Sequence, residues 1–79
     1  MPETVLRETF GHRLKRVRLT TVEPLTGYPM TQKDLARRLN VTTMAIIYWE
    51  SDKRWPSGTV RMVISSIWPE EFSQSGDVI

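Results

Sequence analysis

The stretch TQKDLARRLNVTTMAIIYWE, residues 31–50, restricts the fold of this chain more than any other part of the sequence. It divides at Asn40-Val41 into two short segments, each of which starts at a threonine of the kind that caps helices. In each segment the apolar residues recur at helical spacing on one face: Leu35, Ala36 and Leu39 in the first, and Ala45, Ile46 and Trp49 in the second. Because only two residues separate the periodic segments, we expect two short amphipathic helices that cross at a steep angle.

Four residues of the second segment do not face the first: Thr43, Met44, Ile47 and Tyr48. They stand at positions i, i+1, i+4 and i+5, so they project together from one side of a helix. This is the arrangement of a helix-turn-helix, whose second helix enters the major groove of DNA. The sequence therefore predicts that these four residues contact DNA bases, with Trp49 in the core. The alternative for the exposed Met-Ile pair is a protein–protein patch.

The base-facing residues contain no arginine, asparagine or glutamine, the side chains that recognise purine edges with two hydrogen bonds. Methionine and isoleucine can instead pack on thymine methyl groups, and the two hydroxyls can each form a single hydrogen bond. We expect an A·T-containing half-site with modest direct readout, supplemented by DNA shape.

Length and composition are those of one small globular domain that is stabilised by packing alone. The chain has 79 residues and no cysteine, which excludes disulfides and thiolate metal sites. Apolar runs are too short for a membrane span and the N-terminus has no signal region, so we expect a cytoplasmic protein with no membrane partner. All eleven Lys and Arg residues lie between positions 7 and 61, together with five of the nine acidic residues. A basic body of this kind is suited to a polyanionic partner or to a solvated surface.

The whole pattern predicts an all-α fold of four to five short helices. Besides residues 31–40 and 42–50, apolar periodicity predicts helices at 4–19 and 59–67, and residues 69–72 can add one turn. Gly11 is expected only to weaken the first helix. Residues 20–30 contain two prolines, one glycine and three threonines, which predicts a loop or a small hairpin, with Leu25 and Tyr28 anchored on the body. We expect one domain over residues 1–72 and a disordered tail at 73–79.

The chain resembles lambda-repressor/Cro-like (XRE-type) helix-turn-helix proteins. The resemblance covers residues 6–72 and rests on these parts of the sequence: Leu14–Leu19, Thr31–Ala36, Leu39–Thr42, Ile46, Trp49-Glu50 and Pro56-Ser57. It implies that Arg18 and Glu50 form an internal ion pair. It also implies that Gln32 contacts a phosphate. The chain departs from the family in a surplus of several residues within 20–30, and in Asp52, where the family often has glycine.

Further site residues follow from charge and position. The phosphate backbone is expected to contact Thr31, Gln32 and Lys33, where helical N–H groups also point outward, and Lys53 and Arg54 beyond the second helix. One such domain makes a small DNA interface, so we expect a homodimer on half-sites about 34 Å apart. Trp68 and Phe72, after the last full helix, are the candidates for the dimer contact, whereas Trp55 is expected to cover the core.

These features predict a sequence-specific transcription regulator, in particular a prokaryotic or phage-type repressor that occupies an inverted-repeat operator. The alternative is an antitoxin-like protein that neutralises a partner protein through residues 20–30 or the C-terminal end and regulates its own synthesis. An enzyme is not expected, because no nucleophile, base and orienting group fall together. No cofactor or metal is expected, and His12, the one histidine, has no cluster of carboxylates or cysteines at ligand spacing around it.

Overall fold

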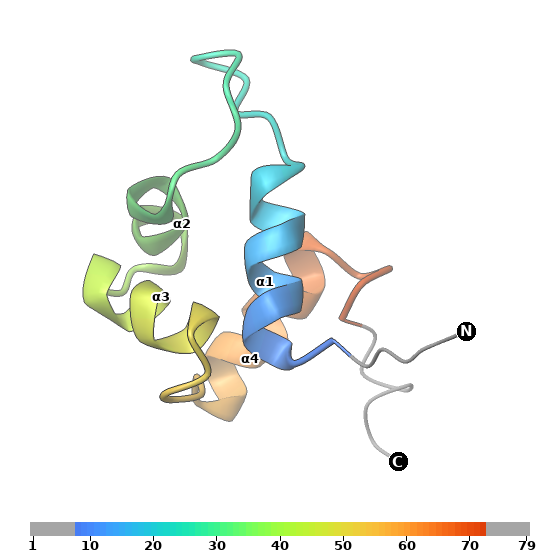
Figure 1. Cartoon of the computed structure of the whole chain (residues 1–79). Coiled ribbons are helices and arrows are strands. Elements are labelled where there is room, and N and C mark those ends of the chain that lie inside the picture. Colours follow the sequence, from blue (N-terminus) through green and yellow to red (C-terminus); the bar gives the residue numbers. More distant parts are fainter. Residues whose placement is uncertain (1–7, 73–79) are drawn as a thin grey trace.

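The computed structural model describes residues 8–72, which form four α-helices (Figure 1). These are α1 (Phe10–Leu19), α2 (Gln32–Leu39), α3 (Thr43–Glu50) and α4 (Gly58–Ile67). No strand is present in this part of the chain, apart from one isolated bridge in the connection between α1 and α2. The all-α prediction is confirmed. The predicted tail at 73–79 and residues 1–7 lie outside the described residues.

The first helix begins later than predicted. Thr9 is its N-cap, with an extended backbone (φ −73°, ψ 165°) and a side-chain hydroxyl that accepts a hydrogen bond from the His12 N–H. A cap in this conformation ends the helical hydrogen-bond ladder, so the prediction that residues 8 and 9 are helical was wrong. The apolar spacing that continues toward Leu6 could not reveal a cap that lies inside it.

The helices α2 and α3 are bounded by the caps that the sequence predicted. The Thr31 hydroxyl accepts from the Asp34 N–H and the Asp34 carboxylate accepts from the Thr31 N–H, which is a complete capping box. Asn40 ends α2 in the left-handed conformation (φ 60°), and the Thr42 hydroxyl caps α3. The hydrogen bond that the Thr31 backbone N–H donates to the carboxylate, followed by the influence of the Thr31 side chain, holds the pKa of Asp34 below its ordinary value. The ionised Asp34 carboxylate in this capping box therefore stabilises the fold at pH values above the usual carboxyl range. This stabilisation is lost as the pH falls through the lowered pKa of Asp34.

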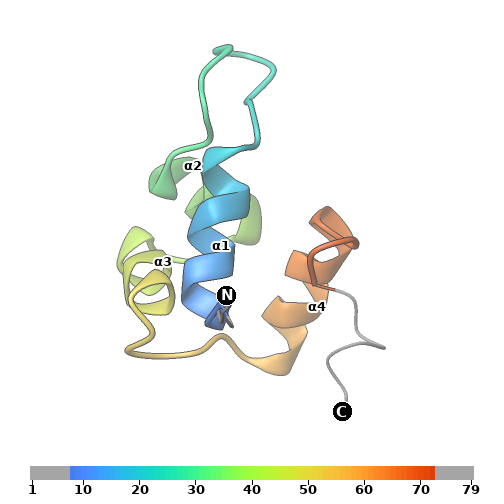
Figure 2. The same ribbon diagram turned by 45° about the vertical axis from the view of Figure 1, so that its right-hand side comes forward.

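The core lies where α1, α2 and α3 meet (Figure 2). Ile64 of α4 is also fully buried in it. Its buried apolar residues are Leu14, Val17, Met30, Leu35, Ala36, Leu39, Ile46, Trp49, Ile64 and Phe72. Phe72 is only 4% exposed and packs its ring against Phe10 and Trp68. Its proposed dimer contact is therefore a mistaken prediction, since almost none of its side chain is available to a partner.

Gly11 marks the closest approach of α1 to the end of α3. A Cβ at this position would lie 2.2 Å from the carbonyl oxygen of Trp49 and 2.9 Å from the carbonyl carbon of Glu50. Both are backbone atoms, so neither can rotate away as a side chain could. The sequence predicts only that Gly11 weakens α1. The structure shows a further role, because the missing side chain allows α1 and α3 to pack at a distance that no other residue permits.

Residues 20–30 form a hairpin-like protrusion from the helical body (Figures 1 and 2). Val22 and Pro29 form the antiparallel bridge, and the Glu23 N–H donates to the Tyr28 carbonyl at 2.9 Å. Leu25 is 96% exposed and Tyr28 72% exposed, so the prediction that they anchor the segment on the body was wrong. Met30, buried at the base of the hairpin, is the actual anchor.

Candidate nucleic-acid interface

Helix α3 presents one buried and one exposed side, as the predicted arrangement requires. Ile46 and Trp49 lie in the core, whereas Met44 is 50% and Ile47 37% exposed. Thr43 is also exposed, and Tyr48 is half-buried. The four residues predicted to contact bases therefore share an accessible, largely uncharged face of α3.

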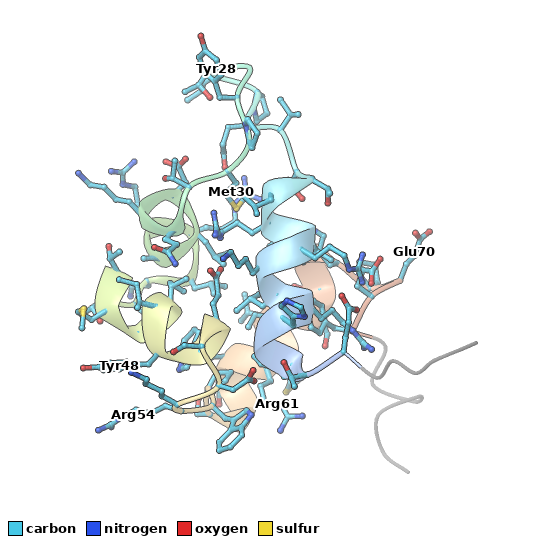
Figure 3. The ribbon with its side chains drawn as sticks, viewed as in Figure 1. Tyr28, Met30, Tyr48, Arg54, Arg61 and Glu70 are labelled. Atoms are coloured by element: carbon cyan, nitrogen blue, oxygen red, sulfur yellow. The ribbon has the colours of Figure 1, made fainter. Side chains whose placement is uncertain are left out.

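Tyr48 joins this face to the basic loop that follows α3. The backbone N–H of Lys53 donates to the Tyr48 carbonyl at 2.9 Å. The Arg54 guanidinium lies over the Tyr48 ring, with its central carbon 5.5 Å from the ring centroid. In Figure 3 both side chains extend from the same side of the molecule. A residue expected at the bases and one expected at phosphate are thus held together before any DNA is bound.

Asp52 ties this loop to the start of α1. Its carboxylate accepts a hydrogen bond from the Thr9 hydroxyl at 2.7 Å and another from the Gly11 N–H at 3.0 Å. The residue itself is left-handed (φ 61°), a conformation that glycine adopts without strain. The departure from the family's frequent glycine at this position is therefore explained, because aspartate replaces conformational freedom with a bond to another helix.

The ion pair implied by the resemblance is present and buried. The Arg18 guanidinium donates to both Glu50 carboxylate oxygens, at 2.6 and 3.0 Å, and also to the Met30 carbonyl at 2.9 Å. Arg18 is 5% and Glu50 9% exposed. The pair connects α1, the base of the hairpin and the last residue of α3. It fixes the position of the candidate recognition helix relative to α1 more than it adds net stability.

The N-terminus of α2 lies beside this network. The Gln32 side-chain amide donates to a Glu50 carboxylate oxygen at 3.0 Å, so its position is set by the buried pair. Thr31 and Lys33 are exposed, and Gln32 is half-buried. Three of the five residues predicted to contact phosphate are therefore accessible at one helix end, and the bond to Glu50 orients Gln32 in advance.

The remaining predicted residues lie elsewhere. Trp68 is half-buried, and its indole N–H donates to the Thr21 hydroxyl at 2.9 Å, bracing the base of the hairpin. Trp55 and Met62 are 64% and 65% exposed, so the expectation that Trp55 covers the core was wrong. The spacing of apolar residues gave no signal for this exposure, because Trp55 lies in a loop.

Two negative findings concern only residues 8–72. In this range no set of three or more His, Cys, Asp or Glu side chains could hold a metal ion. None of the helices described there is long and apolar enough to span a membrane.

The comparison with protein families identifies the central segment. Residues 30–60 match the family model described as helix-turn-helix, whose type is that of XRE and lambda-repressor proteins. The match includes α2, α3, the basic loop and the start of α4, and the four-helix fold is consistent with a lambda-repressor-like domain. No curated protein and no solved structure gives a significant match. The segment is thus a helix-turn-helix of the predicted type, which supports a DNA-binding transcription regulator.

Proposed function

We propose that this protein is a sequence-specific double-stranded DNA-binding repressor, in which α3 enters the major groove. The observation that carries the proposal is the composition of the exposed side of α3 and its neighbours. Thr43, Met44, Ile47 and Tyr48 are accessible on one helix, Arg54 lies over the Tyr48 ring, and Gln32 at the start of α2 donates to Glu50 at the end of the same helix. Apolar and hydroxyl groups flanked by cations and helical N–H groups suit base edges between two phosphate strands.

The two flanks of α3 have distinct tasks in this proposal. Thr31, Gln32 and Lys33 hold one backbone strand, where the N–H groups of α2 add to the attraction for phosphate. Lys53 and Arg54 hold the other. Contacts of this kind set the register of the helix in the groove, and the outward side chains of α3 then read the bases.

A homodimer on an inverted repeat completes the site. A single domain buries too little surface for tight specific binding, and two copies related by a two-fold axis read two half-sites. With Phe72 in the core, the accessible apolar residues Met62 and Val63 of α4 join the half-buried Trp68 as candidates for the contact between copies.

The dimer is tested by the stoichiometry of the DNA complex. Sedimentation of the protein with an inverted-repeat duplex, selected from a random pool by binding to the protein, is expected to give two chains per duplex. On a duplex with one half-site we expect one chain and weaker binding. Replacing Met62 with serine should weaken binding to the full site more than to the half-site. One chain per full inverted repeat, at saturating protein, would contradict the dimer.

The hairpin supports a second candidate function, in which the protein also binds a protein partner. Its Leu25 and Tyr28 side chains are exposed on an ordered turn, and residues 20–30 carry no Lys or Arg with which to hold DNA. Replacing both with serine separates the two functions. This double variant should bind DNA with the affinity of the wild type. If the hairpin also binds a protein partner, as in an antitoxin, the variant should lose the ability to neutralise that partner.

A further inference from the structure

Trp55 is a large apolar side chain that the fold leaves in solvent. It is 64% exposed, and among the described residues its indole has no hydrogen-bond partner and no ring contact. Its N–H donor and most of its apolar surface are therefore free. The two other tryptophans differ from it, since Trp49 is in the core and Trp68 donates to Thr21.

The loop that carries Trp55 is fixed by contacts on both sides. The Lys53 and Arg54 N–H groups both donate to the Tyr48 carbonyl, and Asp52 is bonded to the first turn of α1. Pro56, the next residue, is buried. Trp55 is thus held in the solvent by an ordered backbone, and not by a loose end of the chain.

This position continues the candidate DNA interface. Arg54, which precedes Trp55, lies over the ring of Tyr48 on α3. Lys53 and Arg54 are exposed cations, and the nearest acid in the sequence, Asp52, already accepts two hydrogen bonds. An anionic surface can therefore approach the loop without meeting an unpaired carboxylate there.

We propose that Trp55 contacts the sugar–phosphate backbone of double-stranded DNA at the edge of the groove that α3 enters. The flat face of an indole is suited to a deoxyribose, and its N–H can donate to a phosphate oxygen, so both free parts of this side chain acquire a partner. Such a contact carries no sequence information and adds affinity on any duplex. The inference rests on the proposed function, since it requires α3 to be in the groove.

Acrylamide quenching of tryptophan fluorescence tests the contact directly, because acrylamide is neutral and is not repelled by DNA. The wild-type protein is compared with Trp55→Phe, free and with a short mixed-sequence duplex, and the difference between the two proteins reports Trp55. In the free protein we expect a strongly quenched component that Trp55→Phe lacks, and we expect DNA to shield it. If DNA binds but this component stays as accessible as before, the inference fails while the proposed function stands.

Affinity gives a second, independent readout. Trp55→Ala is expected to weaken binding about 10-fold on specific and mixed-sequence duplexes alike, with an unchanged dependence on salt. Lys53→Gln is the matched comparison. Loss of one cation that contacts a phosphate should reduce the steepness of the plot of log K against log salt concentration by about 0.9. A loss confined to the specific duplex would contradict a backbone contact.

Two further results would overturn the inference for different reasons. If a higher protein concentration without DNA shields Trp55 from acrylamide, Trp55 belongs to the contact between two copies of the chain, for which Met62 is also a candidate. Absence of binding by the wild-type protein to any duplex would overturn the proposed function and this inference together.

Discussion

Replacing Gly11 with alanine is expected to lower the free energy of unfolding by about 3 kcal/mol or more, a large part of the total stability of a domain this small. In most helices the same change stabilises by up to about 1 kcal/mol. Here the new methyl group would stand 2.2 Å from the Trp49 carbonyl oxygen, and α1 and α3 would have to separate. Urea denaturation followed by circular dichroism measures the loss.

Gly58→Ala is the matched control for this prediction. Gly58 is also helical, at the start of α4, but a Cβ there would meet no atom within 4 Å. We expect this variant to be unchanged or stabilised by at most about 1 kcal/mol. If the two alanine variants had similar unfolding free energies, the close approach of α1 and α3 would not exist in solution.

Removing Glu50 is expected to have an effect of similar size for a different reason. Glu50→Ala leaves the buried Arg18 guanidinium with the Met30 carbonyl as its remaining partner, and it takes an acceptor from Gln32. An uncompensated buried charge costs about 3–5 kcal/mol. The unfolding free energy in urea is the measurement, and DNA affinity should fall with it because α3 loses its brace to α1.

The double variant Arg18→Met with Glu50→Leu distinguishes charge burial from a simple loss of packing. With both charges replaced by apolar groups, most of the lost stability should return, since a buried pair adds little net stability over apolar residues of similar size. Glu71→Gln is the exposed counterpart: its carboxylate pairs with Arg16 at 2.8 Å in solvent, and its loss should cost less than about 1 kcal/mol. Equal effects of Glu50→Ala and Glu71→Gln would contradict the account of the buried pair.

The parts of this fold that the sequence predicts are those with local causes. Caps at Thr31, Asn40 and Thr42 act on backbone groups a few residues away, so their residue types alone reveal them. Helix α2 is amphipathic as its apolar spacing predicts, whereas the exposed side of α3 is itself largely apolar, with Met44 and Ile47 in solvent. The ion pair of Arg18 with Glu50 is not local, and it was accessible only through the resemblance to a known family.

The parts that the sequence does not predict depend on contacts between distant segments. The need for glycine at position 11 arises from Trp49, and the left-handed Asp52 is fixed by Thr9 and Gly11. Phe72 follows a proline that ends the last periodic segment, so nothing in the spacing shows that the chain returns to Phe10. Exposure of Leu25 and Trp55 is equally invisible, because loops have no periodicity from which a buried side can be inferred.

The exposed side of α3 was predicted residue by residue, whereas its surroundings were predicted only in part. The sequence indicates which of its side chains face away from α2. It does not show that Arg54 lies over Tyr48, or that Glu50 orients Gln32. Those contacts depend on how the loop after α3 turns back, which requires the three-dimensional fold.

The central claim is that α3 reads DNA sequence, and selection of bound duplexes from a random pool tests it most directly. The selected duplex is then titrated with salt, using the wild-type protein and the variants Thr43→Ala, Met44→Ala and Tyr48→Ala. We expect an enriched inverted repeat containing A·T pairs, and variants that lose the preference for it while keeping the salt slope. No enrichment, or an enriched sequence that all three variants bind as well as the wild type, would contradict the claim.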